Sequence, residues 1–274
     1  MGIYDRDYYR QTLPRGGFGH FSAWSVTTWL LIANIGIFFL AGTLHRLNTP
    51  IVDPDQVDDV RQWLSHVADS WMGPLERWGY FSINKAIFAG QLWRFISFQF
   101  LHSSITHLLG NMLGLFFFGP IVEAHFGSRR YLAFYLLCGF AGALSYIILS
   151  YTHILYLSPA TPLVGASAGV FGLLVAAAMI APHVQVFYYF FPITIGMLAI
   201  GGILIAAYTV FALGPNAGGE AAHLGGAALG FLIMKNQHWL SIFAQLPRET
   251  AYSARRQRPR KRTIQKDWSK DMNR

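Results

Sequence analysis

The sequence predicts an all-α polytopic membrane protein with six transmembrane helices. Of its 274 residues, 53% are hydrophobic and only 12% are charged, and the mean hydropathy is +0.35, a balance typical of multi-span proteins. Residues 131–219 contain no Asp, Glu, Lys or Arg, whereas a soluble domain of that length needs charged surface turns. Six apolar stretches are long enough to cross a bilayer, and they lie near residues 24–44, 104–122, 130–151, 164–181, 192–213 and 220–237.

The first stretch is interpreted as a retained span that follows a short N-terminal arm. Residues 22–44 contain no charge and are longer than a secretory h-region, so a cleaved signal peptide is the less favoured alternative. The arm contains Asp5 and Asp7, which an acid-poor organellar transit peptide would lack.

A long loop, residues 45–99, separates the first two stretches and is predicted to lie on the outer interface of the bilayer. Part of it has apolar residues at helical spacing with aspartates around them, which indicates an amphipathic segment. The aspartates could suggest calcium binding, but the loop spacing and central glycine of an EF-hand are missing. The apolar residues are Val57, Val60, Leu64, Val67 and Trp71, and the acidic ones are Asp53, Asp55, Asp58, Asp59 and Asp69.

The distribution of Lys and Arg predicts that both termini are cytoplasmic. The arm has three of these residues, the turn at 126–131 has two and the tail from Lys235 has eleven, whereas the short loops at 152–163 and 214–219 have none. The positive-inside rule gives the orientation. The expected location is the inner membrane of a bacterium, and the expected parts are a cytoplasmic arm (1–23), a six-helix domain (24–237) and a basic cytoplasmic tail (238–274).

The tail from Arg248 onward is predicted to be disordered and to lie near anionic lipid headgroups. Its residues 255–262 combine low hydrophobicity with high positive charge. The six spans disfavour a nucleic-acid interpretation of this run, so the expected partner is membrane lipid and not nucleic acid. Cys138 is the only cysteine, so no disulfide or thiolate zinc site is available, and we expect it to be a buried small residue.

Four polar residues are predicted to lie at one depth in the membrane. The second, fourth and sixth stretches enter from the outer side, and near their starts they carry His107 and Asn111, Ser167, and His223. At about 1.5 Å per residue, each lies on the order of 5–10 Å below the outer interface. Each alone has a structural alternative, since Ser and Asn residues often pack or bond neighbouring helices. Together they predict one site, because ionisable groups at that depth are costly without a function.

Acyl transfer is the chemistry that these residue types perform together. Ser167 is the predicted nucleophile, and His223 is its general base and then its general acid. The Asn111 amide, the His107 imidazole and the free backbone N–H groups at Ser167 would stabilise a tetrahedral oxyanion. Glu220 is the only carboxylate between Ser167 and His223. We expect it at the helix entrance rather than orienting the base, so no acidic third member is predicted.

Two other interpretations are less favoured. Residues 165–169, Gly-Ala-Ser-Ala-Gly, match the nucleophile elbow of α/β-hydrolases, but that motif needs a preceding strand and an acid between Ser and His. His102, His107 and His223 could ligate a metal, but no carboxylate joins them. We therefore expect no metal and no organic cofactor.

A set of short motifs runs from residue 93 to about residue 235. They are Trp93-Arg94, His102, His107-x-x-x-Asn111, Glu123-x-x-x-Gly127-Ser128, Gly165-x-Ser167 and Ala222-His223-x-x-Gly226-x-x-x-Gly230. With them the chain resembles the rhomboid intramembrane serine proteases. The resemblance implies a six-helix rhomboid-like core, a Ser-His dyad without an acid, and an oxyanion hole formed by the His and Asn of the second span together with backbone.

Two residues depart from the family pattern. Ala168 follows the serine where the family usually has Gly, a change that affects helix packing or the oxyanion backbone but leaves the nucleophile. Phe171 lies one turn below the serine, where the family often has Tyr, and it can stack on His223 but cannot hydrogen-bond.

Supporting roles are expected for four further residues. Gly165 and Gly226 are suited to close helix approach. Trp93 and Arg94 are implied by the resemblance to clamp the first loop, and anchoring at the membrane interface is the alternative for this pair.

Water access and substrate entry complete the prediction. Polar residues just above His107 could line a wet pocket. The glycine-rich loop at 214–219 has the composition of a mobile lid, and a movement of the lid and the fifth helix would admit a substrate helix. The pocket residues are Gln99, His102, Ser103, Ser104 and Thr106, and the fifth stretch contains Pro192, Gly196, Gly201 and Gly202.

The expected function is that of an intramembrane serine endopeptidase acting on single-span transmembrane proteins in or near the outer half of the bilayer. One alternative is a catalytically silent rhomboid-like protein that binds transmembrane clients. A small-molecule transporter is another, but it should show inverted repeats with broken helices in both halves.

Overall fold

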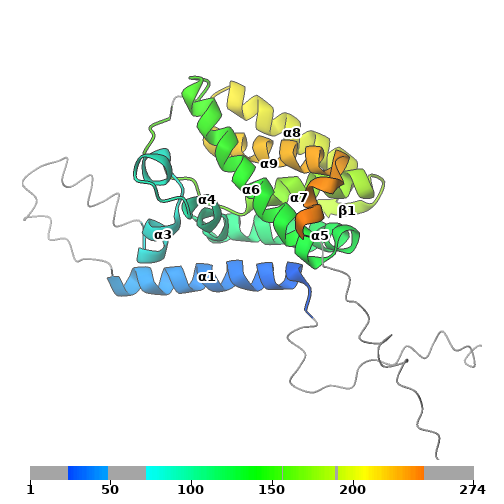
Figure 1. The fold of residues 1–274 in the computed structure, drawn as a ribbon, viewed down its shortest axis with the longest axis horizontal. Coiled ribbons are helices and arrows are strands. Elements are labelled where there is room, and N and C mark those ends of the chain that lie inside the picture. Colours follow the sequence, from blue (N-terminus) through cyan, green and yellow to red (C-terminus); the bar gives the residue numbers. More distant parts are fainter. Residues whose placement is uncertain (1–23, 49–71, 156, 189–190, 244–274) are drawn as a thin grey trace, which may run out of the picture. The chain divides into compact units, whose positions relative to one another are not determined.

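The computed structural model describes residues 24–48, 72–155, 157–188 and 191–243, which are mostly helical. Six long helices account for most of them: α1 (Val26–Asn48), α5 (Ile105–Phe126), α6 (Ser128–Tyr151), α7 (Ser167–Ile180), α8 (Ile195–Phe211) and α9 (Ala217–Lys235) (Figure 1). The first loop contributes α3 (Pro74–Gly79), a π-helical turn (Asn84–Phe88), α4 (Arg94–Ser97) and a 3-10 turn (Phe98–Phe100), and a second 3-10 turn (Gln237–Phe243) follows α9. The arm (1–23), the amphipathic segment (57–71) and the tail after residue 248 lie outside the described residues.

Each of the six long helices overlaps one of the predicted apolar stretches. Three of them are long and apolar enough to cross a membrane, over Val26–Arg46, Ile105–Phe126 and Ser128–Tyr151, so the chain is an integral membrane protein. The apolar helices α7 and α8 have 14 and 17 residues, which corresponds to about 21 and 26 Å. That all six helices cross the bilayer remains a prediction.

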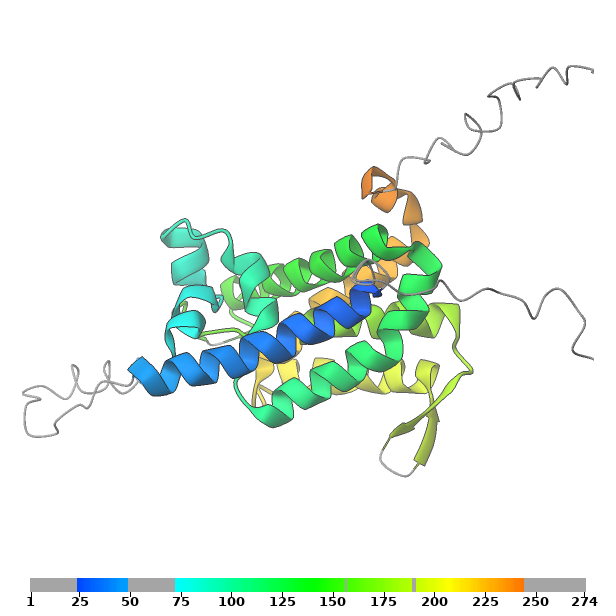
Figure 2. The ribbon, with the colours of Figure 1, turned by 90° about the horizontal axis from the view of Figure 1, so that it is seen from below.

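A short β-hairpin between α7 and α8, which the sequence did not predict, interrupts the otherwise helical fold. Strand β1 (Gln185–Tyr188) pairs antiparallel with β2 (Phe191–Thr194), and the hairpin projects from the helices (Figure 2). The fifth stretch was predicted to begin at residue 192, but this residue lies in β2. Thr194 instead caps α8, because its side chain accepts a hydrogen bond from the Met197 N–H at 3.2 Å.

Helix α7 packs closely against α6 and α9 through small residues. A Cβ at Gly172 would lie 2.5 Å from Cys138 Sγ, and one at Gly230 would lie 2.9 Å from the Gly172 backbone. Gly226 faces the carbonyl group of Ala168 so closely that no Cβ fits there. The predicted close helix approach at Gly226 is therefore present, and Cys138 is a buried free cysteine, as expected.

The carboxylate of Glu123, near the end of α5, fastens the start of α1. It accepts hydrogen bonds from the backbone N–H groups of Val26 and Thr27 at 2.8 and 2.9 Å. It also accepts from the hydroxyls of Thr27 and Ser128, both at 2.8 Å. Two otherwise orphaned donors at the positive end of α1 are thereby satisfied by a negative group.

Replacing Glu123 by Gln is expected to lower the free energy of unfolding by about 1–3 kcal/mol, because an amide NH₂ group would face hydrogen-bond donors. Thermal unfolding in detergent measures the change as a lower midpoint. Glu76→Gln is the control. Glu76 lies in the first turn of α3, and among the described residues it makes no hydrogen bond to the first turn of α1. An equal loss in both variants would contradict the capping role.

Candidate active site

The candidate site lies where α5, α7 and α9 begin. Ser104 caps α5, and its side chain accepts a hydrogen bond from the His107 N–H at 3.1 Å. Ser167 is the first residue of α7, and no side chain caps that helix. Asn216 precedes α9 with φ of 61°. Three helix N-termini, each with free or lightly capped N–H groups, therefore meet at one place.

One cavity of about 330 Å³ joins the residues predicted for catalysis. His107 and Asn111 line it from α5, Ser167 and Phe171 from α7, and His223 from α9. The remaining lining residues are Phe98, Thr106, Gly110, Leu163, Val164, Gly165, Ala168, Val170, Asn216, Gly219 and Ala222.

Gly165 shapes the approach to Ser167. Its φ of +132° is in a region that disfavours side chains, and a Cβ there would lie 2.7 Å from His107 Nε2. Its own N–H donates to the Phe98 carbonyl at 2.9 Å, which holds the turn before α7 in place. The glycine thus allows the chain to pass beside His107 immediately before the serine.

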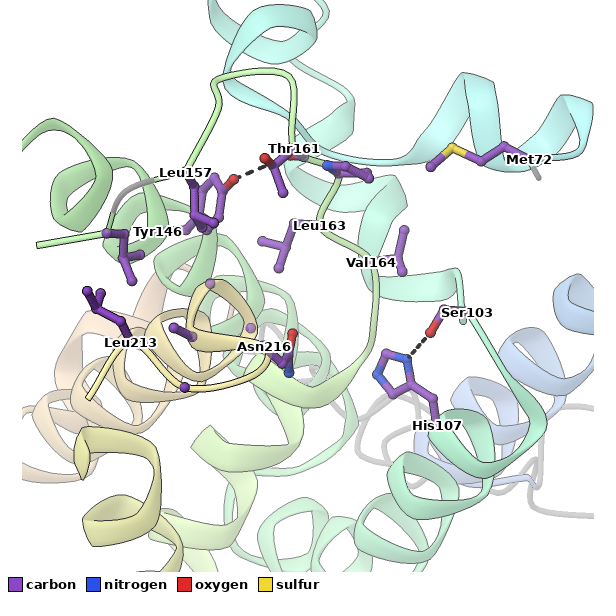
Figure 3. Close-up of a pocket in the computed structure, with 16 residues that line it drawn as sticks. Met72, Ser103, His107, Tyr146, Leu157, Thr161, Leu163, Val164, Leu213 and Asn216 are labelled. Atoms are coloured by element: carbon purple, nitrogen blue, oxygen red, sulfur yellow. Dashed lines mark hydrogen bonds between the residues drawn. The ribbon is translucent and has the colours of Figure 1, made fainter. Parts of the chain in front are cut away.

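The donors predicted for the oxyanion lie on α5. Ser103 Oγ and His107 Nδ1 are 3.1 Å apart (Figure 3), which leaves His107 Nε2 for the side facing Gly165. The Asn111 Nδ2 group is buried and has no hydrogen-bond partner among the described residues. A buried unpaired amide donor is costly, and an anionic oxygen or a water in the cavity would satisfy it.

His223 is held on two sides. Its ring stacks on Phe171 with a centroid distance of 4.3 Å and an interplanar angle of 8°, the contact expected for that residue. On its edge, His223 Nδ1 lies 2.8 Å from Glu220 Oε2. Within the described part of the chain, no hydrogen bond links Ser167 Oγ to His223.

The Glu220 contact corrects the sequence interpretation. Glu220 lies in the first turn of α9, at the helix entrance as expected, but its carboxylate also contacts His223, which the sequence interpretation did not expect. The signal was present in the sequence, because residues three apart on a helix share a face.

His102 lies behind the site rather than in it. His102 and Gln99 are both buried. Neither lines a cavity at the site, although both were predicted to line a wet pocket. The His102 ring packs edge-on against His107 with centroids 5.1 Å apart. Burial, together with the neighbouring His107, lowers the pKa of His102 to about 3. Thr106 does line the cavity that contains Ser167, and Ser103 lines a second cavity, described below.

His102 should make the protein acid-sensitive. Its pKa in the folded state is below the unfolded value of 6.5, so between those values the unfolded chain binds more protons, and stability falls as the pH drops below about 6.5. We expect the fall in thermal midpoint between pH 7 and pH 4.5 to be smaller in His102→Phe than in wild type. The exposed His183 gives the control, His183→Phe, which should keep the wild-type pH dependence; an identical pH dependence in all three proteins would refute the prediction.

Trp93 and Arg94 do not line the cavity that holds Ser167 and His223. They line a separate open pocket with Pro74, Arg77, Trp78 and Gln91, and they fasten the first loop. The Arg94 guanidinium donates to the Arg77 carbonyl at 2.8 Å and to the Tyr80 carbonyl at 2.5 Å. Trp93 stacks on Trp78 with centroids 5.6 Å apart. These contacts are those of a loop clamp.

A second cavity, of about 720 Å³, opens beside the first. The two share five lining residues, which are His107, Leu163, Val164, Asn216 and Gly219. Figure 3 shows Ser103 and His107 on one wall, Leu157 and Leu213 on the opposite side, and Leu163 between them. None of its described lining residues is Asp, Glu, Lys or Arg. It is therefore suited to apolar rather than charged groups.

No metal site is evident at the cavities: among the residues that the structure describes, no three His, Cys, Asp or Glu side chains gather as metal ligands.

Comparison with known proteins finds a family model and several relatives that resemble this chain. The model of the Rhomboid domain matches residues 89–237. RHOMBOID-like protein 4 of Arabidopsis thaliana is 29% identical over 229 residues, covering 79% of this chain and 54% of that protein. Rhomboid protease GluP of Bacillus subtilis is 35% identical over 98 residues, covering 36% of this chain and 18% of that protein. RHOMBOID-like protein 2 of Arabidopsis thaliana is 31% identical over 167 residues, covering 57% of this chain and 50% of that protein. The chain spans about half the length of the two Arabidopsis relatives.

Proposed function

Because the chain belongs to the rhomboid family, which includes proteins named as proteases, we propose that it is an intramembrane serine endopeptidase. Its substrates would be single-span membrane proteins, cleaved in or near the outer half of the bilayer. The observation that carries this proposal is the shared cavity of Ser167, His223, His107 and Asn111, with the unpaired Asn111 amide among them.

The residues can be assigned to the steps of acyl transfer. Ser167 Oγ attacks the scissile carbonyl carbon while His223 takes the hydroxyl proton. The new oxyanion accepts hydrogen bonds from Asn111 Nδ2, from His107 and from the N–H groups at the start of α7. The positive end of α7 favours the same negative charge.

Collapse of that intermediate breaks the peptide bond, and His223 gives the proton to the leaving amine. A water molecule then attacks the carbonyl carbon of the Ser167 ester while His223 takes a proton from it. The second intermediate collapses, the bond to Ser167 Oγ breaks, His223 returns the proton to that oxygen, and the carboxylic acid product leaves. Thr106, His107 and Asn216 place polar groups around the cavity where such a water would enter.

The second cavity supports an extended, apolar substrate segment. Its wall at Leu163 is held by two backbone hydrogen bonds with Phe81, at 2.7 and 3.0 Å. A helical substrate hides its carbonyl carbons, so segments that unwind easily would be cleaved best.

Entry of the substrate would require movement of α8 and the loop before α9. The predicted lid is shorter than expected, because residues 217–219 already belong to α9. Helix α8 exposes large side chains on one side, including Leu204 and Tyr208. Cross-linking α8 to α5 should slow cleavage of a transmembrane substrate, and full activity after cross-linking would exclude this route.

Both termini are proposed to be cytoplasmic, on the basis of the Lys and Arg distribution. Reporter fusions at each terminus test that orientation.

The test of the function is labelling by a fluorophosphonate probe in detergent, beside cleavage of a generic single-span substrate. Wild type should be labelled and should cleave, and Ser167→Ala should do neither. Ser150→Ala is the matched control, because its hydroxyl bonds the Tyr146 carbonyl and the residue lines neither cavity. A folded wild type that takes no label would favour a silent protein that binds transmembrane clients.

A further inference from the structure

The pair formed by Glu220 and His223 is the feature that an acid-free dyad does not explain. The carboxylate oxygen and the ring nitrogen Nδ1 are 2.8 Å apart, and the two side chains are only 20% and 13% exposed. They lie three residues apart on the first turns of α9. The contact is therefore short, largely shielded from water and built into one rigid element.

The location of this carboxylate is unusual for the chain. Glu220 is the only Asp, Glu, Lys or Arg in residues 131–234. An ionisable group in such a segment is costly unless it has a partner or a function. A structural alternative exists, because an acidic residue in the first turn also complements the helix dipole.

The geometry points to Glu220 as a positioning residue for the proposed reaction: we propose that it orients His223 as the base for Ser167, as the acid of a Ser–His–Glu arrangement. This inference rests on the proposed function. The carboxylate accepts a hydrogen bond from the Nδ1–H group of His223, which leaves the Nε2 lone pair free for the serine hydroxyl. When His223 takes the serine proton, the neighbouring carboxylate stabilises the imidazolium.

The surroundings of His223 assign this task to Glu220. Phe171, on α7, fixes the plane of the ring by stacking but offers no hydrogen bond. His107, on α5, lines the same cavity and is the other titratable side chain that faces it, but its Nδ1 is paired with Ser103. Among the described residues, the hydrogen bond to Glu220 is the one that fixes the rotation of the His223 ring within its plane.

The experiment compares Glu220→Gln, Glu220→Ala and Glu220→Asp with wild type in three measurements: kcat/KM against pH, thermal unfolding, and the ¹⁵N NMR signature of the His223 tautomer. Glu76→Gln is the control, because it removes an equal charge from the first turn of α3 and lines neither cavity.

We expect Glu220→Gln to lower kcat/KM on the order of 10- to 100-fold and Glu220→Ala to lower it further. The pH profile of kcat/KM should differ from that of wild type in both, because the imidazolium loses a neighbouring negative charge. Glu220→Asp should recover part of the activity. In wild type the NMR signature should place the proton on Nδ1, and in Glu220→Ala it should show a mixture.

Two results would overturn the inference. One is a loss of activity that only follows the loss of folded protein, with an unchanged pH profile, as a purely helix-stabilising carboxylate would give. The other is a tautomer that is the same in wild type and Glu220→Ala. A folded wild type without fluorophosphonate labelling would instead overturn the proposed function, and because the tautomer is measured without catalysis, the two failures are distinguishable.

Discussion

A His223→Ala variant should cleave a transmembrane substrate at least about 10³-fold more slowly than wild type, because a serine hydroxyl without its base is a poor nucleophile. Loss of the serine or of the base alone typically costs nearly as much as loss of both. The double variant with Ser167→Ala should therefore be hardly slower than either single variant. Initial rates with a purified single-span substrate measure the effect.

The fold of the His223→Ala variant should survive. The ring contacts Phe171 and Glu220 at the edge of a cavity, so its removal leaves the helix contacts below it in place. His183→Ala, at an exposed position between α7 and α8, is the control and should keep the wild-type rate. Near-normal cleavage by His223→Ala with an intact thermal midpoint would exclude His223 as the base.

Replacing Gly226 by Ala should destabilise the protein by about 3 kcal/mol, which lowers the thermal midpoint by about 5–10 °C. The added methyl group would collide with the carbonyl of Ala168, and backbone cannot move aside as a flexible side chain can. Because Ala168 follows Ser167, the displaced backbone should also reduce the activity of the protein that remains folded.

Gly201 provides the matched control for this prediction. It lies within α8, and a Cβ built there meets no atom within 4 Å. Gly201→Ala should therefore leave stability unchanged or raise it slightly through better helix propensity. If both variants were equally unstable, helix packing at Gly226 would not be the cause.

The helices could be predicted from the sequence because each apolar stretch is long. Their ends could not, since they depend on caps and packing: α5 continues through Pro120 to Phe126, and α8 starts at the Thr194 cap. The hairpin at Gln185–Thr194 was missed because a short apolar run does not distinguish a strand from a helix end.

The residues that share the cavity could be predicted from their depth, which follows from helix direction alone. The contacts that His102 and Glu220 make with the histidines of the cavity could not be predicted in the same way. His102 was expected beside water because it is polar and close in sequence to His107, but the chain before α5 turns it inward. Glu220 was assigned to the helix entrance, and its proximity to His223 depended on which side-chain direction the first turn of α9 adopts.

Cys138 allows the proposed movement of α8 to be measured. It is the only thiol in the chain, and it is fully buried against Gly172, out of reach of maleimides and nitroxide reagents. A pair of cysteines introduced on the lipid-facing sides of α8 and α5 would therefore carry spin labels without any background. The distance distribution between the two labels, with and without a bound inhibitor, would report the movement of α8 away from α5.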